Sequence, residues 1–160
     1  MMTSSIVMNK VVVRDAKKPE LPRIIELIQL GALGTSVEKP EELAPYERAF
    51  DVIEMSGSSL LVAEVDGEIV GTLQLIVFQH LQYNGGLCGE LESVHVHPDW
   101  RNHGVGGVLV EAALARAQAQ GCYRVQLTSN SQRSDAHRFY ENHGFAKSHQ
   151  GFKRFLSPPD

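Results

Sequence analysis

The segment 97–109 constrains the fold of this chain most, because it combines an extended run, a polar turn and the start of a helix. Pro98 ends the extended run, and Gly104, Gly106 and Gly107 open the helix. Glycine has no side chain, so the N–H groups of such a turn can approach a ligand closely. The first N–H groups of a helix lack partners within it, and the helix dipole adds positive charge there. The segment therefore predicts a site for an anion such as a phosphate.

Arg101 at the mouth of the turn adds a full charge and several donors. The plain alternative is a helix that begins with flexible residues and binds nothing. Two common phosphate motifs do not fit. The Walker pattern needs Gly-Lys-Ser/Thr where this chain has Gly106-Gly107-Val108, and a dinucleotide fingerprint needs glycine where Leu109 stands. The next strand also ends in Thr128-Ser129-Asn130 where that fingerprint has an acid.

Bulk properties narrow the class of protein. A length of 160 residues predicts one domain over 1–160, and a net charge of −4 without a basic run argues against nucleic-acid binding. Residues 1–10 are too polar and short for a signal peptide, and no apolar stretch reaches membrane-spanning length. We therefore expect a cytoplasmic protein without a membrane partner. Cys88 and Cys122 form no CxxC pattern, which favours reduced thiols.

Hydrophobic periodicity predicts a mixed α/β (α+β) fold, a mostly antiparallel sheet of six to seven strands with helices on both faces. The expected strands are 10–14, 60–65, 69–78, 88–97, 123–128, 145–149 and 152–156. The expected helices are 19–30, 41–55, 105–119 and 135–143, the last capped by Ser134. A helical crossover between 88–97 and 123–128 implies one parallel β-α-β pair. This pair contains residues 101–107, which we call the glycine turn.

Two motifs resemble the GCN5-related N-acetyltransferase (GNAT) family. Arg101-Asn102-His103-Gly104-Val105-Gly106 is similar to its R/Q-x-x-G-x-G/A motif, and 136–145 is similar to its A-x-x-F-Y-x-x-x-G-F block. Residues 92–98 resemble the family's fourth strand, and the order of elements agrees over the whole chain. Residues 133–140, with Ser148-His149, also resemble the small-molecule branch that contains aminoalkylphosphonate N-acetyltransferases.

The resemblance implies an acetyl-CoA-dependent N-acetyltransferase that moves the acetyl group directly to a primary amine of a small molecule. Main-chain groups of the fourth strand would pair with the pantetheine arm, and N–H groups of the glycine turn would hold the pyrophosphate. The implied cofactor-binding residues are Val94, His95, Val96, Arg101, Asn102, His103, Gly104, Val105, Gly106, Gly107, Asn130, Arg133 and Tyr140. No metal is expected, since His95 and His97 share a strand but spacing supplies no third ligand.

Tyr140 matches the family's acid position, where a neutral phenol can protonate the departing thiolate. The alternative is a core aromatic on a short amphipathic helix. Glu92 is the candidate base, directly or through water, and Glu90 shares its strand face by alternation. The alternative for these carboxylates is a solvated face. By resemblance, a main-chain N–H near Val94 would stabilise the oxyanion.

Arg133 stands where many relatives carry Asn. It is a candidate for holding the cofactor's phosphates or an anionic group of the acceptor, with Asn130 as a substitute for the missing amide. His137 and His143 flank Tyr140 and are candidates for lining the site. The sequence names no acceptor, although the expected acceptor region, 24–55 and 79–86, contains several carboxylates.

A second reading is a non-catalytic acetyl-CoA-binding module that regulates a partner. A DNA-binding regulator is a third, but the chain lacks a basic helix. Members of the family commonly pair through sheet edges or C-terminal strands, so the resemblance also allows a homodimer.

Overall fold

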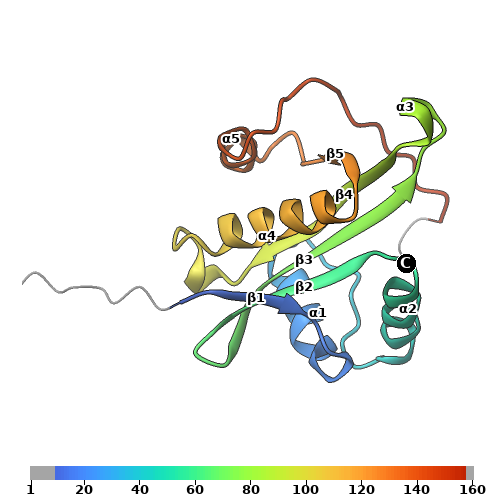
Figure 1. The fold of residues 1–160 in the computed structure, drawn as a ribbon. Coiled ribbons are helices and arrows are strands. Elements are labelled where there is room, and N and C mark those ends of the chain that lie inside the picture. The colour runs from blue at the N-terminus through green and yellow to red at the C-terminus, as the bar shows by residue number, and fades with distance from the viewer. Residues whose placement is uncertain (1–9, 158–160) are drawn as a thin grey trace, which may run out of the picture.

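The computed structural model describes residues 10–157 and contains one five-stranded sheet in that range, in the order β1-β2-β3-β4-β5 (Figure 1). The strands are β1 (Val12–Asp15), β2 (Ser59–Val65), β3 (Glu68–Gln79), β4 (Leu87–Val96) and β5 (Cys122–Leu127). The helices are α1 (Leu21–Leu30), α2 (Ala44–Met55), α3 (Gln82–Gly85), α4 (Val105–Ala119) and α5 (Ser134–Asn142), with short 3₁₀ turns at Lys18–Glu20 and Pro98–Trp100.

The sheet is antiparallel from β1 to β4, and β5 adds a parallel edge strand. Its two faces carry two separate apolar clusters, because successive strand residues point to opposite sides. Leu61 and Ala63 of β2 pack with α4, while the intervening Val62 packs with α1 and α2. The helices therefore cover both faces of the sheet, as the sequence predicted (Figure 1).

Helix α4 lies close to the sheet. Its buried face carries Leu109, Val110 and Ala113, and Gly71 of β3 lies directly beneath it. A Cβ added at Gly71 would stand 2.9 Å from Leu109 Cδ1, so glycine is required for this close approach. The parallel crossover predicted between the fourth and fifth strands is confirmed, and α4 is its helix.

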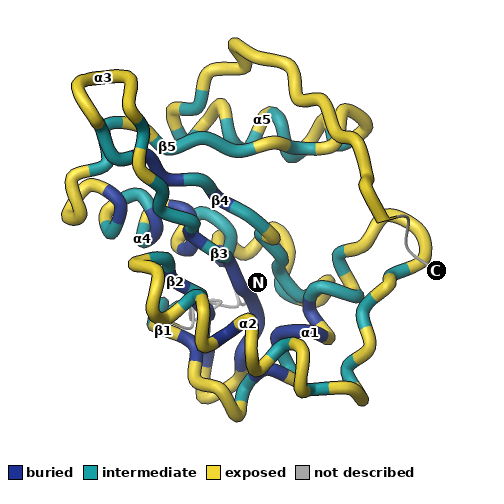
Figure 2. Tube along the Cα trace, turned by 90° about the vertical axis from the view of Figure 1, so that its right-hand side faces the viewer, coloured by how far each residue is buried: buried dark blue, intermediate teal, exposed yellow. Residues whose placement is uncertain are grey.

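The expectation of six to seven strands is wrong for the described part of the chain. Residues 145–149 and 152–156 pair with no strand, and the segment after α5 is exposed along most of its length (Figure 2). Phe152 is 92% exposed. Apolar alternation predicted strands here, but a strand forms only where a neighbour accepts its hydrogen bonds.

Two helix starts also differ from expectation. Helix α2 begins at Ala44, later than predicted, because Pro45 fits only the first turn of a helix. The sequence predicted Ser134 as the N-cap of α5. In the structure the N-cap position is Arg133, and its side chain makes no capping hydrogen bond.

Cys88 is buried and Cys122 half-buried, and both are free. Within residues 10–157, every helix is too short or too polar to cross a membrane.

Leu109 generates a stability prediction, because its side chain is 0% exposed at the centre of the larger cluster. We expect Leu109→Ala to lower the free energy of unfolding by about 2–5 kcal/mol through lost burial and a residual cavity. Chemical denaturation measures this change. Val108→Ala, next along the helix and 41% exposed, is the control and is expected to change stability by less than about 0.5 kcal/mol. Equal effects at both positions would contradict this packing.

Candidate active site

Strands β4 and β5 separate halfway along β4. Their pairing ends at Leu91 and Leu127, whereas β4 continues to Val96. The last part of β4 is still paired with β3 on its other side, through Thr72 and His95. Residues 94–96 therefore present an edge that no described strand covers, and an extended ligand can add to such an edge through main-chain hydrogen bonds.

A β-bulge at Ser93 changes which side chains share a face of β4. Ser93 has φ +50°, and the register with β3 shifts between Thr72 and Gln74. Leu91, Val94 and Val96 all pack on the α4 side. Glu90 and Glu92 alternate with Leu91 and so lie on the opposite face, which is covered by α1.

His95 lies on that same α1 face, because a Cβ added at Gly31 of α1's C-terminal end would overlap its imidazole ring. Strict alternation would have placed His95 opposite Glu92. The bulge thus brings a carboxylate and an imidazole onto one face, a juxtaposition that sequence spacing missed. Nothing in the sequence signals it, because Ser93 is not a residue that usually adopts positive φ.

The glycine turn lies directly after β4, as predicted. Asn102 and Gly104 adopt positive φ, +62° and +81°, and Gly104 caps α4 without any side-chain hydrogen bond. The first N–H groups of α4 are thus left for a ligand or solvent. Gly106 and Gly107 also have a packing role, since Cβ atoms there would stand 3.4 Å from Phe139 Cζ and 3.2 Å from His143 Nε2.

A cavity of about 220 Å³ lies beside the open edge of β4. Its lining comes from the end of α1, the end of β4, the glycine turn and the start of α5. The lining residues are Leu30, Gly31, Ala32, Leu33, Val94, His95, Val96, Arg101 and Arg133. This lining includes two arginines and no carboxylate, so the cavity favours anionic groups.

Arg133 closes one side of this cavity. Its Nη2 donates a hydrogen bond of 2.7 Å to the carbonyl oxygen of Gly31, which joins the start of α5 to the end of α1. Arg101 lies nearby and its Nε donates to the Val96 carbonyl at 3.4 Å. Burial lowers the pKa of His95, and the positive charges of Arg133 and Arg101 lower it further.

Tyr140 lies on α5 and packs edge-to-face with Phe139 and Phe145, at centroid distances of 5.1 and 5.9 Å. Burial raises the pKa of its phenol, and the charge of Arg133 opposes that rise. The hydroxyl is therefore protonated at neutral pH. The charge of Arg133 therefore acts on the pKa of both His95 and Tyr140.

Several predicted residues are engaged elsewhere. The side chain of Asn130 accepts from the N–H of Gln132 within its own turn, and the imidazole of His103 contacts the Arg101 carbonyl. His137 contacts the Asn130 carbonyl, and His143 contacts Glu111 of α4. Glu92 is half-buried but is not among the residues that line the cavity.

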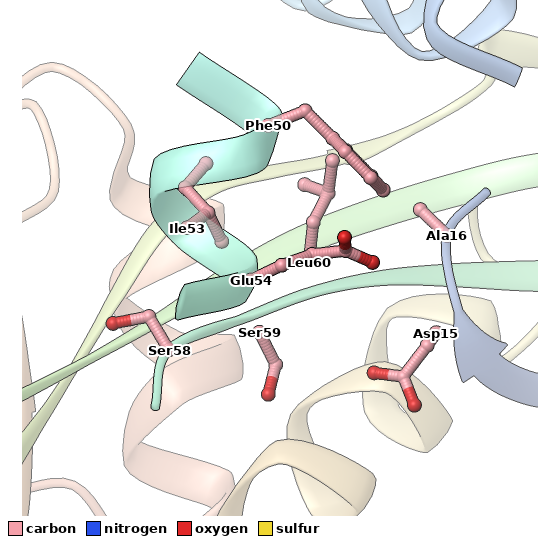
Figure 3. Close-up of a pocket in the computed structure, with 8 residues that line it drawn as sticks. All are labelled: Asp15, Ala16, Phe50, Ile53, Glu54, Ser58, Ser59 and Leu60. Atoms are coloured by element: carbon pink, nitrogen blue, oxygen red, sulfur yellow. The ribbon is translucent and has the colours of Figure 1, made fainter. Parts of the chain in front are cut away.

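A larger cavity of about 400 Å³ lies between the end of β1, α2 and the start of β2 (Figure 3). Phe50 and Leu60 supply apolar surface, and Asp15 and Glu54 supply carboxylates. None of the motif residues lines it, so its size does not make it the candidate site.

The model of the acetyltransferase (GNAT) family matches residues 22–145. The aminoalkylphosphonate N-acetyltransferase of Salmonella typhimurium is 34% identical over 91 residues, which are 57% of this chain and 58% of that protein, less than two thirds of its length. The glucosamine 6-phosphate N-acetyltransferase of Trypanosoma brucei brucei is 32% identical over 121 residues, 72% of this chain and 79% of that protein.

A crystal structure described as a transcriptional regulator from Bacillus halodurans C-125 is similar over 92% of this chain and 100% of its own. Its TM-score is 0.85 and its sequence identity 37%.

The electrostatic link between Arg133 and His95 generates a prediction. Replacing Arg133 with Gln removes a positive charge that disfavours the imidazolium, so we expect the pKa of His95 to rise. NMR titration of the His95 ring protons measures it. Arg124→Gln is the control, because that guanidinium lies over the Tyr123 ring, and it should leave the pKa of His95 unchanged. A fall in the pKa of His95 in the Arg133→Gln variant would show that Arg133 and His95 are not coupled in this way.

Proposed function

The chain belongs to the acetyltransferase (GNAT) family, whose model matches residues 22–145, and from this premise we propose that it transfers the acetyl group of acetyl-CoA directly to a primary amine of a small molecule. The observation that carries the proposal is the open edge of β4, which ends beside a glycine turn at a helix N-terminus. An extended arm and a pyrophosphate need these two features next to each other.

Acetyl-CoA is a substrate here, because its acetyl group is consumed. The main chain of Val94, His95 and Val96 pairs with the pantetheine arm, and N–H groups of residues 102–107 bind the pyrophosphate. Arg101 adds charge at the mouth of this turn. The N–H of Val94, beside the Ser93 bulge, stabilises the oxyanion.

Two side chains serve the proton transfers around this thioester. Tyr140 donates its phenolic proton to the departing sulfur, which a buried and neutral phenol is suited to do. The acceptor arrives largely as an ammonium, since a free alkylamine has a pKa of about 10.4. Glu92 removes that first proton through water, because it lies on the α1 face but outside the cavity lining.

The acceptor carries an anionic group beside its amine. Two relatives are named for acceptors that combine nitrogen with a phosphorus oxyanion, aminoalkylphosphonates and glucosamine 6-phosphate. In this chain the matching charge is Arg133, whose guanidinium reaches the carbonyl of Gly31 at the end of α1 and lines the cavity beside His95. That location favours the acceptor over the pyrophosphate as its ligand.

A second candidate function is supported by the similar structure described as a transcriptional regulator. In that case the chain binds acetyl-CoA and regulates a partner without turnover. Acetyl-CoA raises the melting temperature in both cases, because a ligand that binds only the folded state stabilises it. Only the enzyme releases free coenzyme A, which a thiol reagent detects.

A panel of amines tests the enzyme and its acceptor together. We expect coenzyme A release with a short aminoalkylphosphonate, and a much higher KM for the alkylamine of equal length that lacks the phosphonate. Arg133→Gln should bring the two KM values together, while Arg124→Gln keeps them apart. Stabilisation by acetyl-CoA without release for any amine would instead establish the regulatory module.

Tyr140 generates a separate prediction. Tyr140→Phe should lower kcat by about 10²–10⁴-fold, the usual contribution of a general acid, because the thiolate then leaves without a proton. Affinity for acetyl-CoA should change little. Steady-state kinetics and calorimetric titration measure the two quantities, and Tyr123→Phe, on β5 and outside the expected acceptor region, is the matched control. Unchanged kcat at saturating substrates would remove Tyr140 from the mechanism.

A further inference from the structure

His95 differs from the other six histidines of the chain. Each of those has a polar partner for its ring, namely Tyr123 for His80, the Asp99 N–H for His97, the Arg101 carbonyl for His103, the Asn130 carbonyl for His137, Glu111 for His143 and Ser148 for His149. In the part of the chain that the structure describes, the His95 ring nitrogens have none. A half-buried imidazole without a structural hydrogen bond is free for a ligand.

The side chain of His95 borders the cavity. His95 is one of the cavity's lining residues. Among the described residues, no fully buried side-chain nitrogen or oxygen lacks a hydrogen-bond partner. Because the His95 nitrogens have no such partner, they are not fully buried, and the open volume beside them is the cavity next to residues 94–96.

We propose that His95 accepts a proton from the acceptor amine as the amine attacks the thioester. The proposal rests on the function proposed above and adds to it a side chain that the sequence assigned only a main-chain role. The Ser93 bulge is what makes it feasible, since it turns the ring of His95 to the α1 face while the neighbouring main chain stays at the open edge.

The charges around His95 keep it able to accept a proton. Arg133 faces it from the start of α5 and Arg101 from the turn after β4, while Gly31, packed against it from α1, carries no charge. Glu92 shares its strand face. Burial and the two guanidinium groups lower the pKa of His95, so its imidazole is neutral at neutral pH. The same positive charges disfavour the ammonium form of an amine in this cavity.

The step balances with groups already assigned. The ammonium first loses a proton to water beside Glu92, and the free amine then bonds to the thioester carbonyl carbon. This bond makes the nitrogen acidic, and one of its protons passes to a His95 ring nitrogen. The C–S bond breaks, and the sulfur takes the phenolic proton of Tyr140. The imidazolium proton returns through solvent to the tyrosinate, which leaves the amide, coenzyme A and the original protein.

The test is the pH dependence and chemical rescue of His95→Ala. We expect kcat to fall by about 10²–10⁴-fold, as for loss of a general base, and the acidic limb that we expect in the wild-type kcat to disappear. Added imidazole should restore turnover in proportion to its concentration, which a purely structural role would not allow. His97→Ala, two residues along, should keep both the wild-type kcat and the acidic limb.

An increase in the melting temperature of His95→Ala on addition of acetyl-CoA shows that this variant folds and binds acetyl-CoA. If His95→Ala does not fold, His95→Gln is used in its place. If the wild type turns over and a His95 variant keeps a kcat within about threefold of the wild-type value, the role assigned to His95 is overturned, but the proposed function is not. A variant with low kcat, an intact acidic limb and no response to imidazole would overturn it as well. Lack of turnover in the wild type with every amine would overturn the proposed function itself.

Discussion

The separation of β4 from β5 after Leu91 is the constraint on which the rest of the site depends. Up to that residue β4 is an interior strand with both edges paired, and beyond it one edge is free while β3 still holds the other. A free edge in the middle of a sheet is normally a liability, because it invites pairing with another chain. Here the adjacent glycine turn supports the proposal that an extended, phosphate-bearing molecule binds along this edge.

The bulge at Ser93 determines which side chains of β4 lie on each face of the sheet. Val94 and Val96 pack toward α4 and anchor the strand in the core. His95 turns to the α1 side, where Arg133 joins α5 to Gly31. In the function that we propose, main chain and side chains of the same residues contact two different substrates, acetyl-CoA along the edge and the amine in the cavity.

Much of the fold could be predicted from sequence, because periodicity and turn residues report local structure directly. The strands predicted at 60–65 and 69–78 and the parallel crossover over α4 follow from such signals. The bulge, the free edge and the bond from Arg133 to Gly31 depend on residues distant in sequence. The same limit explains the wrongly predicted strands near Phe152. The apolar pattern there is typical of a strand, but among the described residues no strand pairs with this segment.

The most direct test of the account is where acetyl-CoA contacts the backbone. Titration of ¹⁵N-labelled protein with acetyl-CoA, followed by amide NMR, reports this residue by residue. We expect the largest changes at residues 94–96 and 102–107, with little change around Phe50 and Leu60, which line the larger cavity. Changes centred on that larger cavity, with residues 94–96 unaffected, would contradict this expectation.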